Sequence, residues 1–466
     1  MGEPVSQNYD VVLYAVNNIG ITFAQQIKDI LEQTYGLSIW EEYAIHSNID
    51  HRVAAELREE DPEFSDADRP LAVGVFTNTE LRDDQGTNTM KMPKGKPIFI
   101  VHPVYTHGQD SLTVDQNLAF FEACVEKIVF QSPDSPIFFV APDFPYAMSH
   151  SQLKHLKEGH HQAGVLENMV VPNLRNLGID GIVTIMSHCP NQLVPACRSH
   201  VYRYGKREFG GFRLDVVDID PFGAIIYNGE ADFEAPILDQ IRQEVFLFAP
   251  IVENLSGYHT LIITPDGGQR DRTALTLGRY GFPIIDLDKV RYDEGKIKIK
   301  DGDEIKFDFI NYFRSRNIQP GDTIVLVVTD DFVNTGGTGN KALAEVVSCI
   351  REAERQYFVE HSETKPLTIT TKLFVAHAKT VSSNEIFLWN VDEIFYLTTH
   401  GRSAYGSLLS GLISSQMQLS YRYVRELEQI FPDNRRVITH ECAMSPSHML
   451  AGGIAYMLQK RNLFSK

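Results

Sequence analysis

Short apolar runs alternate along the chain with longer stretches in which apolar residues recur at helical spacing. Val11–Val16 has the pattern of a strand, and Phe23–Glu32 has that of an amphipathic helix. Strands that are almost wholly apolar are buried on both faces, which is typical of a parallel sheet covered by helices. Further strands are predicted at Pro97–His102, Ile137–Ala141, Gly181–Met186, Thr260–Thr264, Thr323–Thr329, Leu373–His377 and Ile394–Thr398.

Helical stretches between these strands decide the fold class. Asn117–Phe130 and Lys341–Phe358 have the length of crossover helices, so the pattern predicts an α/β protein. Asn228–Ile251 reads as a helix at a boundary, and each half of the chain has its own series of strands. We therefore predict two doubly wound parallel-sheet domains, at residues 1–235 and 236–466.

Composition and charge narrow the class of protein. The 466 residues are 43% hydrophobic and 22% charged, as in an ordinary soluble protein, and no run approaches the roughly 18 apolar residues of a membrane span. The first ten residues lack a basic and then apolar segment, and the five cysteines show no CxxC spacing, which together favour a reducing cytoplasm. The net charge of −18 disfavours nucleic acid as a partner.

One segment combines several features of a phosphate site. Thr323–Gly339 reads TIVLVVTDDFVNTGGTG: an apolar strand ends in Asp330 and Asp331, and Thr335-Gly336-Gly337-Thr338 follows just before a predicted helix. Ligands of α/β sheets bind at the carboxyl ends of parallel strands, and glycines let a backbone close around a phosphate at a helix N-terminus. Paired carboxylates accept hydrogen bonds from a sugar diol. The segment therefore predicts a ribose-phosphate cradle.

The cradle resembles the phosphoribosyl diphosphate (PRPP) fingerprint of type I phosphoribosyltransferases and PRPP synthetases. A transferase needs one such domain, so the two predicted domains favour the synthetase and disfavour a simple phosphoribosyltransferase. Further segments resemble synthetase motifs and follow in the family's order: Leu13–Ala15, Phe76–Glu80, Phe144–Ala147, Thr184–His188, Thr264–Gly268 and Lys289–Arg291.

The resemblance implies an activity. PRPP synthetases use magnesium and transfer the β,γ-diphosphoryl group of ATP to the anomeric hydroxyl of ribose 5-phosphate, releasing AMP. It also implies residue roles. Lys289 and Arg291 match the family's K-x-R pair, which neutralises the charge of the transition state, and the polar segment after them is expected to form a flap. His188 and Asp266 match its magnesium contacts.

The remaining roles concern the two substrates. Phe76 and Glu80 match the segment that lies against the ATP base. Arg270 and Arg272, which follow Asp266 on a predicted helix, either face phosphates or are solvated. The acceptor sugar and its phosphate are assigned to Asp330, Asp331, Thr335, Gly336, Gly337 and Thr338.

Three departures from the family pattern fall near these segments. The R-Q-D segment that contacts ATP is replaced by Met148-Ser149-His150, and His150 is the candidate that takes over part of the ATP contact. Asn334 stands where the family has an aspartate before TGGT. Met186 replaces the aspartate of the family's T-M-D-L-H.

These departures leave other functions open. ADP-ribose is an alternative acceptor for the same chemistry in NAD salvage, with the added segments 37–71, 197–214 and 402–427 as candidate walls for the extra nucleotide. An inactive regulatory subunit is a second alternative, favoured by the loss of R-Q-D and disfavoured by the intact K-x-R and TGGT. Family members assemble into oligomers, so the resemblance implies a homo-oligomer.

Overall fold

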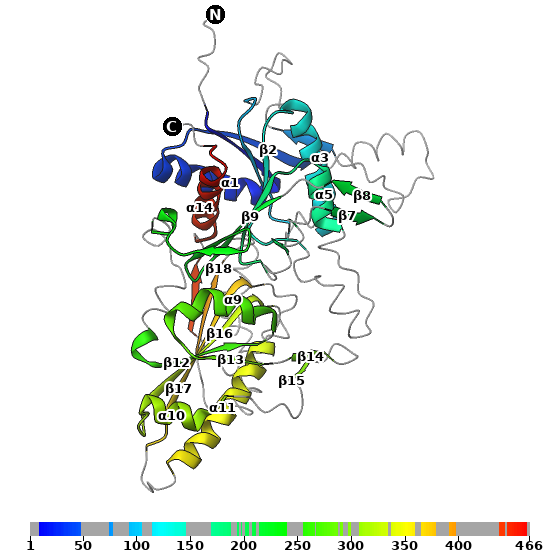
Figure 1. Ribbon diagram of the computed structural model, residues 1–466. Coiled ribbons are helices and arrows are strands. Elements are labelled where there is room, and N and C mark those ends of the chain that lie inside the picture. The colour runs from blue at the N-terminus through cyan, green and yellow to red at the C-terminus, as the bar shows by residue number, and fades with distance from the viewer. Residues whose placement is uncertain are drawn as a thin grey trace, which may run out of the picture. The chain divides into compact units, whose positions relative to one another are not determined.

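The computed structural model of the chain has two compact units (Figure 1). The first unit comprises residues 1–184, 194–217 and 447–466, and the second comprises residues 185–193 and 218–446. The structure describes residues 9–47, 74–77, 93–104, 114–145, 169–187, 193–194, 197, 201–204, 207–210, 214–239, 255–265, 267–287, 289–291, 297–299, 307–333, 337–358, 365–378, 391–397, 438–442 and 445–463.

This division differs from the expected one at 235/236 in two places. The second unit starts at Asp218, inside a strand, and the C-terminal residues from Ser447 on belong to the first unit. The expected boundary helix Asn228–Ile251 is wrong at its start, because Asn228 has φ 52° and Glu230–Asp232 pairs as an antiparallel strand. The Asn228-Gly229 pair is a hairpin-turn signal, and it explains this difference.

The first sheet has nine strands in the order β11-β10-β9-β6-β5-β4-β1-β2-β3. Its central pairs are parallel, and β3 and β11 join as antiparallel edge strands. The bounds are β1 Val11–Val16, β2 Ile39–Ser47, β3 Gly74–Thr77, β4 Ile98–Val101, β5 Ile137–Ala141, β6 Gly181–Ile185, β9 Asp215–Asp220, β10 Ala224–Tyr227 and β11 Glu230–Asp232.

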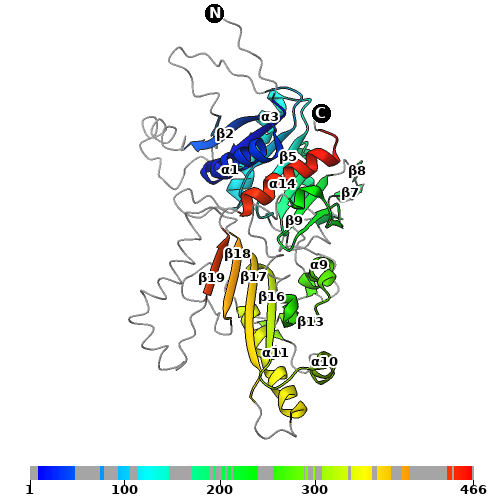
Figure 2. The same ribbon diagram turned by 90° about the vertical axis from the view of Figure 1, so that its left-hand side faces the viewer.

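Helices cover both faces of this sheet in the first unit. α1 (Asn17–Tyr35) and α14 (Ser445–Lys460) lie side by side (Figure 2), and Ser447 Oγ donates to Gln26 Oε1 at 2.5 Å. α3 (Val114–Gln131) packs on the opposite face beside α5 (Val171–Asn176): Phe121 meets Phe139, whereas its neighbour Phe138 faces Arg461 after α14. Successive strand residues point to opposite faces, so these contacts define the two layers.

The sheet of the second unit has the order β13-β12-β16-β17-β18-β19, and all its pairs are parallel. The bounds are β12 His259–Thr264, β13 Ile284–Asp286, β16 Thr323–Val333, β17 Thr368–Ala378, β18 Glu393–Leu397 and β19 Ile438–Cys442. Counted along the chain, the parallel strands of both sheets begin in the order 2-1-3-4-5, with β2, β1, β4, β5 and β6 in the first. This is a doubly wound order, so the predicted fold class is confirmed.

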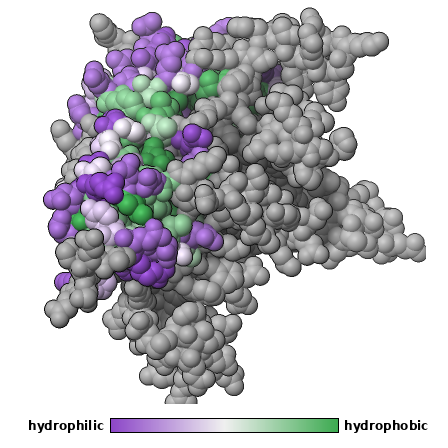
Figure 3. Space-filling view, turned by 60° about the horizontal axis from the view of Figure 1, so that its bottom comes forward, coloured by the Kyte–Doolittle hydropathy of each residue, from purple (hydrophilic) through white to green (hydrophobic). Residues whose placement is uncertain are grey.

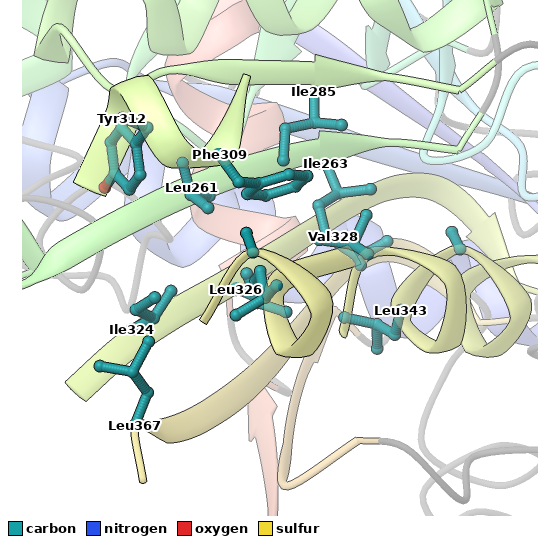
Figure 4. Close-up of a cluster of buried hydrophobic side chains, with 14 of the residues drawn as sticks. Leu261, Ile263, Ile285, Phe309, Tyr312, Ile324, Leu326, Val328, Leu343 and Leu367 are labelled. Atoms are coloured by element: carbon teal, nitrogen blue, oxygen red, sulfur yellow. The ribbon is translucent and has the colours of Figure 1, made fainter. Parts of the chain in front are cut away.

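A single hydrophobic core fills one face of the second sheet (Figure 4). Leu261, Leu326 and Val328 project from the strands toward α10 (Phe309–Arg316) and α11 (Gly337–Tyr357). α9 (Gly267–Leu277) lies on the other face, where Thr273 Oγ1 is 3.2 Å from Thr329 Oγ1. Helices on both faces are what right-handed crossovers produce when the strand order reverses direction.

Short elements complete the described part of the chain. Two antiparallel pairs stand apart from the sheets: β7 (Val201–Tyr204) with β8 (Arg207–Gly210), and β14 (Lys289–Arg291) with β15 (Ile297–Ile299). The 3₁₀ helices are η4 (Leu255–Gly257) and η5 (Gly278–Tyr280).

The surface mixes polar and apolar side chains. On the face shown in Figure 3, hydrophobic residues gather in small groups that hydrophilic residues separate. Large apolar side chains that are exposed include Met169, Tyr258 and Leu275, and isolated exposed side chains of this kind are ordinary. Among the described residues, no helix has the length and apolar character to cross a membrane.

Candidate functional site

The strand order of the second unit marks one edge of its sheet. β12 is followed by β13 on one side, whereas β16 is followed by β17 on the other side. The chain therefore leaves these two neighbouring strands in opposite directions, and the crevice beyond their carboxyl ends is where open α/β sheets bind ligands. The predicted cradle follows β16, so topology and motif point to the same edge.

Polar side chains line up along this edge. Thr264 at the end of β12 is in register with Asp286 at the end of β13, and its Oγ1 donates to Asp286 Oδ1 at 3.1 Å. Arg270 on α9 pairs with Asp286, with 3.0 Å between Nη1 and Oδ2. The edge therefore carries a carboxylate held in place by a hydroxyl and a guanidinium.

The strand before the cradle is longer than predicted. β16 runs to Val333, because its parallel ladder with β17 continues past the expected end at Thr329 to Phe332 opposite His377 and Val333 opposite Ala378. Asp330 lies inside this ladder opposite Val375 and is half-buried, directly after the fully buried run that ends at Thr329. Asp330 is thus the position at which the buried part of β16 ends and the polar edge of the sheet begins.

Two helices begin at this edge. α9 begins at Gly267, after β12, and the 21-residue α11 begins at Gly337, after β16. The first N–H groups of a helix have no partner within it, and they carry its positive dipole end. Two helix N-termini next to the switch point form an environment that favours the phosphate groups of a ligand.

Arg272 has a role that the sequence analysis did not identify. It faces no solvent: the side chain is 2% exposed. Its Nε donates to Asp220 Oδ2 at 2.7 Å, and its Nη1 donates to the Ser187 carbonyl at 2.7 Å. Nη1 and Nη2 each donate to Asp218 at 3.2 Å. Arg270, two residues earlier, is exposed and pairs with Asp286, so the two arginines serve different purposes.

The electrostatics of this cluster follow from its burial. Burial alone would lower the pKa of Arg272, but the carboxylates of Asp218 and Asp220 outweigh it and raise that pKa. Burial raises the pKa of Asp220, against the opposing effect of Arg272. The guanidinium therefore stays charged, and it makes four hydrogen bonds to these partners. Both expectations for Arg272 are therefore wrong: the side chain is bound to these partners and does not face a substrate phosphate, and it is buried and not solvated.

The turn after β6 is a second feature absent from the sequence analysis. Met186 has φ 39°, a left-handed conformation that non-glycine residues rarely adopt. Ser187 Oγ donates to Asp218 Oδ2 at 2.6 Å, and the buried His377 contacts the Ile185 carbonyl through Nε2 at 2.9 Å. Polar residues spaced across the whole chain make these contacts, so no local motif could have revealed them.

The remaining predicted site residues fall into two groups. In the first group the structure describes the backbone only. Lys289 and Arg291 are the two ends of β14, and Phe76 lies on β3. Asp331 lies on β16, and Gly337 and Thr338 are the first two residues of α11. The other members lie outside the described residues: Glu80, His150, His188, Asp266, Thr335 and Gly336. Four of the six acceptor residues thus lie on β16 or at the start of α11, and both residues of K-x-R lie on β14.

Comparison with known proteins addresses the fold. The crystal structure of phosphoribosylpyrophosphate synthetase from Mycobacterium smegmatis aligns over 97% of this chain and 99% of its own, with a TM-score of 0.50 and 13% identity. The two share a fold. A C2-type ketoreductase from a modular polyketide synthase aligns at a TM-score of 0.20 and 12% identity, which is too low to bear on the fold.

Comparison of the amino-acid sequence with known proteins found no related sequence. No family model matches the chain, and no curated protein matches it. The likeness to the synthetase therefore concerns the two-domain phosphoribosyltransferase-like fold. The chemistry of the site has to be argued from the residues of this chain.

Proposed function

We propose that the protein transfers the β,γ-diphosphoryl group of ATP to the anomeric hydroxyl of ribose 5-phosphate, forming PRPP and AMP. The observation that carries the proposal is the arrangement of strand β16 and the helix that follows it, α11. A buried strand reaches the polar edge at Asp330, and α11 begins at Gly337, inside the TGGT segment, after the strand that pairs with β12. A ribose phosphate fits this strand and helix: the carboxylate accepts a hydrogen bond from a sugar hydroxyl, and the helix N-terminus binds the phosphate.

The donor side of the reaction needs positive charge. Diphosphoryl transfer spreads negative charge over the phosphate oxygens, so catalysis rests on positioning and charge neutralisation. Lys289 and Arg291 lie two residues apart on β14, which pairs with β15 opposite Ile299 and Ile297. Alternate residues of a strand share a face, so both cations of K-x-R belong to one face of this hairpin.

Magnesium fits the oxygen chemistry of the edge. Mg²⁺ is usually held by one or two carboxylates together with water and substrate phosphates. Among the described residues, no three metal-ligating side chains cluster. We propose Asp266 and His188 as the protein contacts; the ion would neutralise the triphosphate of ATP.

The test is the reaction itself. The purified chain is incubated with ATP, Mg²⁺ and either ribose 5-phosphate or ADP-ribose, and nucleotides and products are quantified by mass spectrometry. We expect one AMP for each PRPP formed, and no product after chelation of the metal by EDTA. Product formation with ADP-ribose alone would show that ADP-ribose is the acceptor, and the proposed diphosphoryl transfer would still hold. Failure to form AMP with every acceptor would favour the regulatory subunit.

A further inference from the structure

Two helices on one face of the first sheet leave a groove between them. α3 and α5 lie side by side on this face (Figure 1), and the groove lies between α3 and the stretch from Met169 to Leu177, which contains α5. It encloses about 280 Å³, close to the lower end of the roughly 300–1,000 Å³ of small-molecule sites. All of its described lining residues belong to the first unit.

The floor of the groove is apolar and buried. Phe121, Val170 and Leu174 line it, and each is at most 4% exposed. The ring of Phe121 is held from behind, because it stacks on His102 with 5.6 Å between centroids and meets Phe139 at 4.5 Å. A floor that is already fixed binds the apolar body of a ligand without a large ordering cost.

Helix packing does not require a hollow of this kind. Helix surfaces interdigitate and protein interiors are close packed, so neighbouring helices usually fill the space between them with their own side chains. Seven of the nine described lining residues are apolar, whereas an ordered water molecule needs about two to four polar partners. The groove therefore suits an apolar group better than it suits water.

One carboxylate stands at the rim of the groove. Met169 is 44% exposed and Asn173 is exposed, so the groove is open on the α5 side, where Asn173 Nδ2 donates to Glu122 Oε1 at 3.5 Å. Burial raises the pKa of the half-buried Glu122; the Asn173 hydrogen bond opposes this effect, and the negative charge of Glu126 adds to it. No basic side chain in the described part of the chain pairs with Glu122. A bound cation would supply this opposite charge.

The floor and the rim together define the class of ligand. The floor favours an apolar body, and the rim carboxylate favours a positive charge at one end of it. ATP and ribose 5-phosphate are anions, so the groove suits neither. We propose that the groove between α3 and α5 binds a small organic amine, with its apolar body on Phe121 and Leu174 and its ammonium group beside Glu122. This site lies in the first unit, and its test does not depend on the proposed function.

The experiment compares three probes that share a phenyl ring and a two-carbon chain: 2-phenylethylammonium, 2-phenylethanol and phenylacetate. Each is titrated into the full chain labelled with ¹³C at the methionine methyl groups. Binding is followed at the Met169 resonance, which the Met169→Leu variant assigns. Met457 on α14 is fully buried and is the reference within the same spectrum.

We expect 2-phenylethylammonium to shift the Met169 resonance and to leave the Met457 resonance in place. It should bind about 10-fold more tightly than 2-phenylethanol, because a charge-assisted hydrogen bond is stronger than a neutral one, and phenylacetate should bind most weakly. Ala119→Phe places a ring in the groove from α3 and should weaken the binding of all three probes.

Two further variants test the carboxylate. Glu122→Gln keeps the size of the side chain, so it should lower the affinity for the amine to about that for the alcohol. Glu126→Gln is the matched control, because Glu126 is exposed one turn further along α3 and does not line the groove. Its loss should stay below about 2-fold, since exposed charges act weakly.

Three results would overturn the proposal. Equal or higher affinity of the wild type for the alcohol would mean an apolar surface without preference for an amine. Equal losses in Glu122→Gln and Glu126→Gln would assign the binding to the general negative charge of the chain. An unchanged Met169 resonance with every probe would show that none of them enters the groove. Melting curves check that each variant folds, and the comparison of probes on the wild type needs no variant.

Discussion

At the scale of single residues, neighbours in sequence turn out to have unrelated environments. Arg270 and Arg272 are two residues apart on α9, yet one is exposed beside Asp286 and the other is buried among carboxylates. The sequence predicted a helix with two arginines. It could not predict which one is buried, because Asp218, Asp220 and Ser187 come from segments more than fifty residues away. Burial by distant partners leaves no local pattern.

Asp330 is the residue for which the sequence and the structure agree most directly. The DD…TGGT spacing predicted a carboxylate at the carboxyl end of a buried strand, and Asp330 is the first half-buried position after that run. In the proposed cradle, replacing the carboxylate by an amide removes a charged acceptor for a sugar hydroxyl. The cost of such a loss is about 1–3 kcal/mol, or roughly 5–150-fold in affinity.

We therefore expect Asp330→Asn to weaken ribose 5-phosphate binding within that range and to leave ATP binding unchanged, as measured by titration calorimetry. Asp322→Asn is the matched control, because Asp322 precedes the opposite end of β16 and accepts from the Gln319 N–H at 2.7 Å. Equal losses of affinity in both variants, or a loss confined to ATP, would assign the cradle to another ligand.

At the scale of elements, the periodicity predicted most strands and missed where some of them end. The apolar run ended at Thr329, but β16 continues to Val333 because β17 offers a partner for three of the next four residues. Strand pairing is a tertiary property, so a single sequence marks the buried centre of a strand better than its ends. The polar segment after K-x-R contains β15, which pairs with β14 as an antiparallel hairpin.

The β14–β15 hairpin carries a prediction about catalysis. In the proposed reaction Lys289 acts mainly on the transition state, so Lys289→Ala should lower turnover by about 10²–10³-fold while ATP still binds. Lys298→Ala is the matched control on the paired strand, since Lys298 lies opposite Val290 between the two cations. Steady-state kinetics with ATP titrations would measure both. Near-normal turnover by Lys289→Ala would remove this residue from the mechanism.

The end of β4 carries a prediction about pH. His102 is buried, contacts the Asn117 carbonyl of α3 at 3.0 Å, and burial lowers its pKa to about 4. The folded state therefore keeps His102 neutral while the unfolded chain takes up a proton below about pH 6.5. Its contribution to the free energy of unfolding, up to ~3 kcal/mol, is present above pH 6.5 and is lost as pH falls toward 4.

We expect His102→Gln to reduce the loss of stability between pH 6.5 and 4. Urea unfolding followed by the fluorescence of Trp40, in a Trp389→Phe background, would report on the first unit. His448→Gln is a control outside the buried set. Parallel pH profiles for wild type and His102→Gln would show that another group governs the acid response.

At the scale of the whole molecule, the two sheets repeat one strand order, and only the second carries the PRPP-like segment. The alternation of strands and helices predicted the doubly wound class, and the shared fold with the Mycobacterium smegmatis synthetase over 97% of the chain agrees with it. The return of α14 to the first unit was not predictable, because Ser447 and Gln26 are 421 residues apart. Long-range packing decides such boundaries.

The central claim is that an intact diphosphoryl group moves to the anomeric oxygen. Phosphorus nuclear magnetic resonance of the wild-type protein with ATP, Mg²⁺ and ribose 5-phosphate observes this directly. We expect the three ATP resonances to be replaced by the AMP resonance and by the two coupled resonances of a diphosphate on C1. Formation of ADP together with a second monophosphate group on the sugar, or an unchanged ATP spectrum from the folded protein, would contradict the proposed function.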